Sequence, residues 1–394
     1  MNFINARIFT IENGTIEHGF LRTSGEVIAE IGEMGNFISD NNETIDLAEK
    51  SIYPGFIDAH THLGMWEDSL GFEGDDGNEE SDPATPHLRA IDAVNSFDLC
   101  FHEALAAGVT TVVTGPGSAN PIAGQLICLK TLGGRIDPLV IKSPVAMKMA
   151  LGENPKSVYH AKHEAPYTRM ATAAIIREQL RLAQRYLADL EKSEREEEAD
   201  PPDYDIKLEA LLPVLRCEIP VHIHAHRRDD IFTALRIAEE FGLKCVIVHA
   251  TEGHLASDEL IKSGVPILSG PFLCDRSKPE LRGLTPASAG IMSTAGVPLA
   301  IITDHPVTPV QYLPLCAGLA VREGMSHGDA LRAITINPAK ILGIDHRVGS
   351  LAVGKDADFS VFSADPLTLS AKPEMVVVNG GAIFNQIHKK DVEK

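Results

Sequence analysis

Two histidines placed two residues apart offer the clearest chemistry in this chain. His60 and His62 follow the apolar pair Phe56 and Ile57, which is typical of a short β-strand. Side chains two residues apart on a strand point to the same face, so the two imidazoles would converge at the carboxyl end of the strand. A divalent metal ion can bind one nitrogen from each ring there.

The same arrangement recurs in three other strand-like segments. Their ionisable residues are His222, His224 and His226 in residues 219–226, His249 in residues 244–250 and Asp304 in residues 298–305. The last two segments are nearly continuous apolar runs, as expected for strands of a parallel sheet that is covered on both faces. In a β/α barrel the carboxyl ends of several strands together carry the active site. Four strands with such ends therefore favour a (β/α)8 TIM-like barrel with a metal centre.

Residues 54–62 read Pro-Gly-Phe-Ile-Asp-Ala-His-Thr-His. This segment resembles the opening motif of the amidohydrolase superfamily, in the branch of imidazolonepropionase-like and prolidase-like metal-dependent hydrolases, and the resemblance covers nearly the whole chain. It implies a set of metal ligands, which are His60, His62, His224, His249 and Asp304. It also implies that Asp304 is catalytic and handles the proton of the attacking water. Imidazole-rich ligation suits one or two divalent ions, with Zn favoured and Fe, Mn or Ni also suited.

The ligand that would bridge two ions is open between two residues of segment 138–156. Members of the family use either a carbamylated lysine on the fourth strand or a glutamate at the end of the third strand. Lys148 follows apolar residues, as the lysine would, and Glu153 lies in a Gly-Glu-Asn-Pro turn just beyond them. We favour Glu153 as the metal ligand, because this segment directly follows the second predicted strand and because a carboxylate needs no modification to bridge.

Strand and helix patterns alternate over residues 53–346, which is typical of a parallel α/β barrel. Residues 1–52 and 347–394 instead alternate apolar and polar positions between turn signals. We therefore expect a small β-sandwich domain that is built from both chain termini. The resemblance to amidohydrolases implies the same arrangement.

Within the barrel segment, residues 109–115 read as the second strand and residues 265–270 as the seventh. The fourth strand is weakly predicted around Val214 and Leu215. Two insertions interrupt the pattern. Residues 67–86 are acidic and rich in glycine, which makes them a candidate active-site lid, and residues 167–205 have the apolar period of a helix.

Composition limits the partners that the chain can have. A formal net charge of −20 leaves little excess cation to neutralise phosphates, which argues against a nucleic-acid partner. No apolar run approaches the roughly 18 residues of a membrane span, and the amino terminus lacks a secretory signal pattern. Six cysteines without a Cys-x-x-Cys pair are typical of a reducing compartment. We expect a cytoplasmic protein with a small-molecule substrate, and assembly into a homo-oligomer is compatible with this sequence.

The leading hypothesis is a metal-dependent amidohydrolase that cleaves the C–N bond of a cyclic amide, an amide or a dipeptide-like substrate. A deaminase acting on a heterocycle, or a catalytically silent structural relative, is the alternative. His226 follows the strand of His224, and Arg276 lies in the loop after the seventh strand. Both are candidates for substrate contacts, because a basic side chain in such a loop can hold an anionic group.

Overall fold

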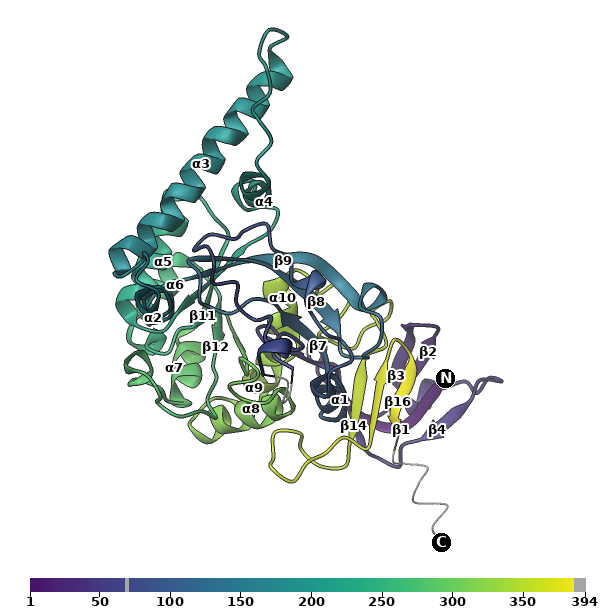
Figure 1. The fold of residues 1–394 in the computed structure, drawn as a ribbon. Coiled ribbons are helices and arrows are strands. Elements are labelled where there is room, and N and C mark those ends of the chain that lie inside the picture. Colours follow the sequence, from purple (N-terminus) through teal and green to yellow (C-terminus); the bar gives the residue numbers. More distant parts are fainter. Residues whose placement is uncertain (68–70, 386–394) are drawn as a thin grey trace.

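The computed structural model describes residues 1–67 and 71–385, which form a barrel and a separate β-sheet (Figure 1). The barrel strands pair in the order β6 (Phe56–Asp58), β7 (Val109–Thr114), β8 (Ile122–Lys130), β9 (Val140–Ala150), β10 (Val221–Ala225), β11 (Cys245–His249), β12 (Ile267–Ser269) and β13 (Leu299–Ile301), read here from β6 to β13. Beyond the ends of the two edge strands, the backbone N–H of His62 donates to the carbonyl of His305 at 2.8 Å. This bond brings β6 and β13 together and nearly closes the barrel.

Strand β8 differs from the expected pattern because it runs antiparallel to both β7 and β9. Only residues 115–121 connect β7 to β8, whereas a parallel neighbour needs a connection of about a dozen residues or more. Our sequence analysis missed β8 and therefore counted β9 as the third strand, although β9 is the fourth. The weak prediction of a fourth strand at Val214 and Leu215 is wrong, because both lie in helix α4 (Ile206–Leu215).

Apolar side chains fill the barrel interior. This cluster includes Ile57, Ala59, Val113, Leu126, Cys128, Ala146, Val246, Val248, Leu268, Ala300 and Ile302. Helix α10 (Ile336–Leu342) adds Ile336 and Ala339 to the same cluster. The side chain of Asn337 donates to the carbonyl of Leu299 at the first residue of β13, so α10 covers the amino-terminal end of the barrel. The interior is therefore a packed core, and the chemistry is confined to the carboxyl end.

Helices surround the barrel on its outer face and, in the case of α10, cover its amino-terminal end. They are α1 (Leu99–Ala106), α2 (Glu153–Ala161), α3 (Arg169–Arg195), α4, α5 (Arg228–Phe241), α6 (Ser257–Ser263), α7 (Ala287–Ala295), α8 (Leu313–Arg322), α9 (His327–Ala333) and α10. Helix α5 shows why these segments are helical. It buries Ile231, Ala234 and Ile237, which lie three residues apart, and it ends at Gly242 in the left-handed conformation that favours glycine.

Both chain termini contribute to the second sheet. It pairs in the order β16 (Gly381–Asn385), β15 (Met375–Val378), β14 (Phe359–Phe362), β5 (Ser51–Pro54), β1 (Asn2–Phe9), β2 (Thr15–Ser24) and β3 (Val27–Glu33), and β4 (Thr44–Asp46) pairs with β1. The buried Lys130 at the end of β8 forms ion pairs with Asp356 and Asp358, which precede β14. These pairs connect the barrel to the terminal sheet.

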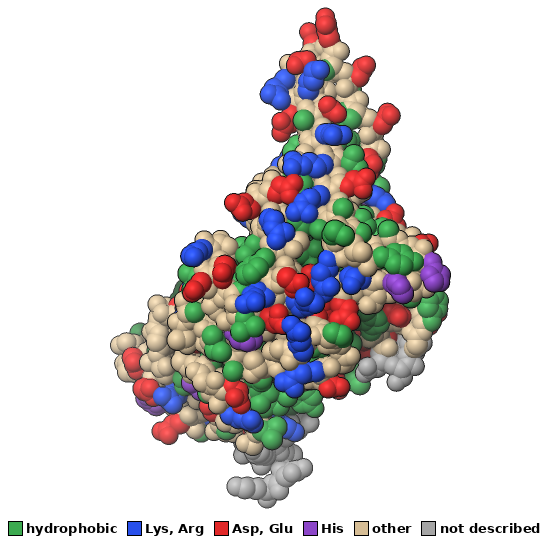
Figure 2. All heavy atoms as spheres, turned by 90° about the vertical axis from the view of Figure 1, so that its left-hand side faces the viewer, with side chains coloured by type: hydrophobic (Ala, Val, Ile, Leu, Met, Phe, Trp, Pro, Cys, Tyr) green, Lys and Arg blue, Asp and Glu red, His purple; other side chains and the backbone are tan. Residues whose placement is uncertain are grey.

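Helix α3 is the expected helical insertion, and its distal half projects from the barrel (Figure 1). This helix of 27 residues packs on α4, and its buried apolar face includes Ile176, Leu180 and Ala183. Figure 2 shows lysine, arginine, aspartate and glutamate side chains interleaved along this arm. In the part of the chain that the structure describes, no helix has the length and apolar content needed to cross a membrane.

Candidate metal centre

A first ligand cluster forms where β6 and β13 end, and consists of His60, His62 and Asp304. Oδ1 of Asp304 lies 3.4 Å from Nε2 of His60 and 3.3 Å from Nε2 of His62. Ligand atoms that share one tetrahedral ion at bond lengths of about 2.0–2.1 Å lie about 3.3–3.4 Å apart. The geometry therefore fits a single divalent cation between these three side chains.

Backbone carbonyls set the orientation of two imidazoles at the site. Nδ1 of His62 lies 2.7 Å from the carbonyl oxygen of Gly115, and Nδ1 of His249 lies 2.8 Å from that of Gly270. A carbonyl oxygen can only accept, so each Nδ1 carries the proton and donates it. Nε2 of each ring is then left with a lone pair for a metal ion.

Asp58 holds the two strands of the first ligand cluster together. Its carboxylate accepts hydrogen bonds from the backbone N–H of His60 at 3.2 Å and from the backbone N–H and hydroxyl of Thr303 at 3.1 and 2.6 Å. His60 is itself a candidate ligand, and Thr303 directly precedes the candidate ligand Asp304. Burial raises the pKa of Asp58 to about 7, because the charged form is desolvated.

A second ligand cluster contains His224, His226 and His249. The ring centroids of His224 and His249 are 4.5 Å apart, and those of His226 and His249 are 4.4 Å apart with nearly parallel planes. Burial, together with the neighbouring His249, holds the pKa of both His224 and His226 well below the usual histidine value. The rings are therefore neutral at physiological pH, which is the state that binds metal.

The inward direction of His249 depends on an unusual backbone conformation. In the pairing of β10 with β11, His249 stands opposite Ala225, whose side chain packs in the core between the barrel and its surrounding helices. Paired residues of neighbouring strands point to the same side of a sheet, so a regular strand would direct His249 outward as well. His249 instead has a φ of 74° and Ala250 a φ of 45°, both in the left-handed region. This bend carries the imidazole over the carboxyl end of the barrel, to the rings of His224 and His226.

Lys148 is fully buried on β9 beside the first ligand cluster. Its Nζ lies 3.1 Å from Nε2 of His60, and its charge also acts on His224 and His249 of the second cluster. Burial lowers the pKa of Lys148 to about 8, since the charged amine is desolvated. Of the two residues that sequence analysis considered as the bridging ligand, Lys148 is therefore the one that lies next to the candidate metal ligands.

Glu153 and Arg276, which sequence analysis proposed for the site, lie outside both ligand clusters. Strand β9 ends at Ala150, so Glu153 falls on the first turn of α2, where its Oε2 accepts a hydrogen bond from the backbone N–H of Glu280 at 3.4 Å. Arg276 is exposed and donates to the carbonyl of Leu284 at 2.7 Å, which closes its own loop. His226, expected as a substrate contact, lies instead among the candidate ligands.

Sequence analysis missed one buried carboxylate at the site, Glu280 in the loop after β12. Its Oε1 lies 3.7 Å from Nε2 of both His224 and His226, and 3.0 Å from Nζ of Lys278. Burial works to raise the pKa of Glu280, but His226 and Lys278 outweigh it and hold the pKa below the usual value. Glu280 stands in a polar loop without strand or helix periodicity, so no local signal in the sequence marks it.

The insertion that was predicted as a lid lies beside the first ligand cluster. Its residues 68–70 fall outside the described part of the chain. The preceding Trp66 packs edge-on against His62 at a centroid distance of 4.9 Å. The backbone carbonyl of Gly77 accepts from Gly117 at 2.7 Å, and that of Glu79 accepts from the side chain of Asn120 at 2.7 Å. The insertion is therefore tied to the β7–β8 connection.

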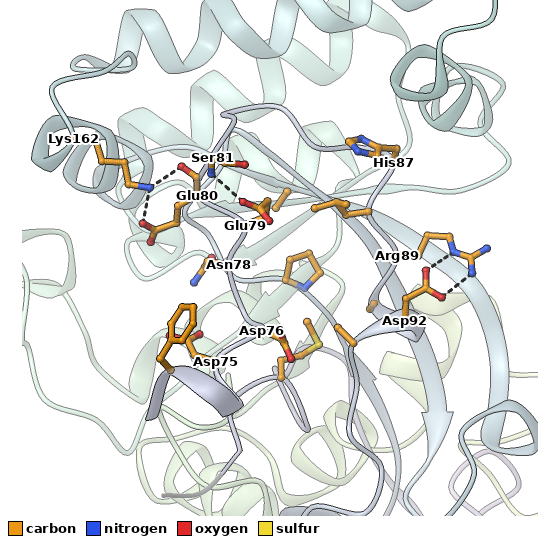
Figure 3. Close-up of a pocket in the computed structure, with 17 residues that line it drawn as sticks. Asp75, Asp76, Asn78, Glu79, Glu80, Ser81, His87, Arg89, Asp92 and Lys162 are labelled. Carbon is orange, nitrogen blue, oxygen red and sulfur yellow. Dashed lines mark hydrogen bonds and ion pairs between the residues drawn. The ribbon is translucent and has the colours of Figure 1, made fainter. Parts of the chain in front are cut away.

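A cavity of about 840 Å³ is lined mostly by residues of segment 65–93, together with Pro116, Ala123 and Lys162 (Figure 3). Its lining combines apolar residues with five acidic ones, which are Asp75, Asp76, Glu79, Glu80 and Asp92. Lys162 pairs with Glu80 at 2.8 Å and Arg89 pairs with Asp92 at 2.9 Å (Figure 3). None of the residues of the two ligand clusters lines it, so the cavity is a separate feature from the candidate metal centre.

The fold and the two ligand clusters define the class of protein as a β/α barrel with candidate metal sites at its carboxyl end. The chain belongs to the Amidohydrolase family, whose sequence model matches residues 51–383. It is similar to the amidohydrolase tasK of Hapsidospora irregularis, with 30% identity over 86% of this chain and 37% of that protein, so it spans little more than a third of that relative.

In two further comparisons the match covers about nine tenths or more of both chains. An imidazolonepropionase of Maricaulis maris is 27% identical over 89% of each chain. The crystal structure of an amidohydrolase from Thermotoga maritima is 40% identical, with a TM-score of 0.94 over 98% of this chain and 99% of that one. The close fit to this solved structure extends over both the barrel and the terminal sheet.

Proposed function

We propose that the protein is a metal-dependent hydrolase that cleaves the C–N bond of a small cyclic amide, amide or dipeptide-like substrate. The observation that carries this proposal is the spacing of 3.3 and 3.4 Å between Oδ1 of Asp304 and Nε2 of His62 and His60. Membership of the Amidohydrolase family supports it. The net charge of −20 and the absence of any disulfide among the six cysteines support a cytoplasmic enzyme without a nucleic-acid partner.

The residues present fit two divalent cations. His60, His62 and Asp304 would hold one, and His224, His226 and His249 would hold the other. The donor set is rich in imidazole, which favours Zn. Two imidazoles have Nδ1 fixed by a carbonyl, so their Nε2 lone pairs are available without rearrangement.

We propose Lys148, in place of Glu153, as the bridging ligand. Its neutral amine would add to CO₂ to give a carbamate and a released proton, and the carbamate has two oxygens that can reach two ions. The contact of 3.1 Å between Nζ of Lys148 and Nε2 of His60 supports this role. A buried ammonium next to neutral imidazoles is costly because no opposite charge pairs with it. Formation of the anionic carbamate would remove this unpaired positive charge.

When bound, a divalent cation would acidify a water molecule and polarise the substrate carbonyl. Asp304 would then accept the proton of the attacking water and return it to the leaving nitrogen. Its carboxylate is suited to accept a proton because it is ionised: burial acts to raise its pKa, but the nearby His249, His60 and His62 hold the pKa well below the usual value. Asp58 and Thr303 keep the carboxylate in position by fixing the strand ends.

A hydrolysis screen of the metal-loaded protein tests the proposal. The substrates are N-acyl amino acids, dipeptides, lactams and imidazolones, with ammonia release measured in parallel. Turnover that disappears in the His60→Ala/His62→Ala double variant would support a metal-dependent hydrolase. Wild-type metal content and turnover in that double variant would refute the assignment, and ammonia release from a heterocycle without ring or amide hydrolysis would identify a deaminase instead.

A further inference from the structure

We propose that Glu280 is an additional ligand of the cation position formed by His224, His226 and His249, and that Lys278 competes with the cation for the same carboxylate. The inference rests on the proposed metal-dependent function and deepens it, because it adds a carboxylate from the loop after β12. Glu280 would add a negative charge to a position whose three histidines are neutral, alongside the proposed carbamate of Lys148.

The distances agree with shared coordination. Oε1 of Glu280 lies 3.7 Å from Nε2 of His224 and 3.7 Å from Nε2 of His226. These separations are too long for hydrogen bonds, which span about 2.7–3.2 Å. Two atoms bound to one ion at about 2.0–2.1 Å lie about 3.3–3.7 Å apart when the angle between the bonds is about 110–125°. Each of the two histidine nitrogens therefore lies at a distance from Oε1 at which the two atoms could bind the same cation.

The histidines of this cluster already have their outer nitrogens engaged. Nδ1 of His224 lies 3.0 Å from the hydroxyl of Ser118, and Nδ1 of His226 lies 2.7 Å from the hydroxyl of Thr251. Nε2 of His224 is buried and has no hydrogen-bond partner within the described residues. A buried, unpaired imidazole nitrogen that faces a carboxylate across 3.7 Å points to a cation between the two.

The carboxylate of Glu280 is held in place by the start of α2. The backbone N–H of Glu153 donates to its Oε2 at 3.0 Å. Gly152 allows this approach, because a Cβ at that position would lie 2.8 Å from Oε2 and because its φ is 83°. With Oε2 fixed in this way, Oε1 is directed at the histidines, so the ligand is preorganised.

Lys278 has more freedom than Glu280. Its Nζ lies 3.0 Å from Oε1 of Glu280 and 2.7 Å from the side-chain oxygen of Asn154. The lysine side chain is 28% exposed whereas that of Glu280 is fully buried, so only Lys278 can move toward solvent. A cation that binds Oε1 would have to displace the ammonium group, and removing that positive charge should strengthen cation binding.

Titration of the chelator-stripped, full-length protein with Zn²⁺ tests the inference. Free Zn²⁺ is followed with a chromophoric chelator, and Co²⁺ absorption spectra report the coordination independently of activity. The wild type should bind two ions. Glu280→Gln should retain the first and bind the second at least tenfold more weakly with an altered Co²⁺ spectrum, whereas Lys278→Met should bind the second more tightly.

Glu153→Gln is the matched control, because it makes the same chemical change in the carboxylate that accepts the reciprocal hydrogen bond from the backbone N–H of Glu280, and because Glu153 lies outside both ligand clusters. It should bind both ions as the wild type does. Circular dichroism establishes that each variant is folded. If Glu280→Gln fails to fold, Glu280→Asp replaces it: this variant retains the charge but has a shorter side chain, so it should also bind the second ion more weakly.

The outcomes separate this inference from the proposed function. Wild-type affinity and an unchanged Co²⁺ spectrum in Glu280→Gln would overturn the role of Glu280, even if the first ion and the hydrolase activity were intact. If Glu153→Gln lost the second ion as Glu280→Gln does, the role of Glu280 as a ligand would also be overturned. The packing of the loop as a whole, and not the carboxylate of Glu280, would then account for binding of the second ion. The proposed function fails instead if the His60→Ala/His62→Ala variant retains the full metal content and activity.

Discussion

The amine of Lys148 lies 3.1 Å from Nε2 of His60, and both side chains are fully buried. A charged ammonium would be costly here, because water is excluded and the imidazole that accepts its hydrogen bond carries no opposite charge. The relationship is explained if the lysine is modified to an anion when metal binds. Under the proposed function, the modification of Lys148 is what would join the two ligand clusters into one centre.

Lys148→Arg should therefore abolish metal bridging, because a guanidinium retains the positive charge and cannot form a carbamate. We expect loss of at least one ion per chain and of most of the activity. A carbamate signal after incubation with ¹³C-bicarbonate, seen by NMR in the wild type alone, would confirm the modification. Lys142→Arg is the control, since Lys142 lies on the same strand but donates to the carbonyl of Leu342 at 3.0 Å. A fully active Lys148→Arg enzyme with two ions would exclude the bridge.

Asp304→Asn should separate proton transfer from metal binding. The amide has nearly the same size but cannot accept the proton, so kcat should fall by about 10²–10⁴-fold. The histidines remain, and part of the metal should be retained on elemental analysis. Asp275→Asn, an exposed aspartate in the loop after β12, should leave kcat unchanged. A folded, metal-loaded Asp304→Asn enzyme that turned over at the wild-type rate would disprove the mechanism.

Asp58→Asn should destabilise the junction between β6 and β13. The carboxylate accepts from His60 on one side and from Thr303 on the other, and an amide group would place a donor against one of these donors. An unsatisfied buried group costs about 1–3 kcal/mol, so we expect a lower thermal midpoint even in chelator-treated protein. Thr303→Val should show a smaller loss of the same kind. Equal midpoints for Asp58→Asn and wild type would show that the carboxylate does not join the strands.

Glu12 should make the structure sensitive to acid. Its carboxylate pairs with Lys340 of α10 at 2.9 Å and accepts from the hydroxyl of Ser350 at 2.7 Å. The hydrogen bond from Lys340 is the main cause that lowers the pKa of Glu12 from 4.5 to about 2, against the opposing effect of burial. Because the folded-state pKa is depressed, the stabilising contribution is complete above pH 4.5 and is lost as the pH falls toward 2.

Glu12→Gln should remove this part of the pH dependence. Thermal unfolding of the variant and the wild type, measured from pH 6 down to pH 3, should show a difference that is largest at the high end and shrinks as the pH falls. Glu17→Gln is the control, because Glu17 lies at the surface and pairs with the partly exposed Arg7. A constant difference across this range would show that the ionisation of Glu12 is not coupled to folding.

The histidines at the ends of β6 and β10 could be located from the amino-acid sequence because strand alternation is a local property. His60 and His62, two residues apart after an apolar pair, needed only the period of an extended chain to be placed on one face. Asp304 was instead expected at the site because it ends a nearly continuous apolar run and because the resemblance to amidohydrolases implies an aspartate there. The prediction of a barrel with a terminal β domain also followed, because it depends on the alternation of element types along the chain.

Other features were decided by contacts between distant parts of the chain. The positions of Lys148 beside the first ligand cluster and of Glu153 outside both clusters could not be predicted without β8, which makes β9 the fourth strand of the barrel. The inward turn of His249 depends on a left-handed backbone that no local pattern predicts. Glu280 reaches the histidines only because the loop after β12 packs against the start of α2. Long-range packing fixes the position of a loop residue, so tertiary structure alone brought this carboxylate to the candidate metal centre.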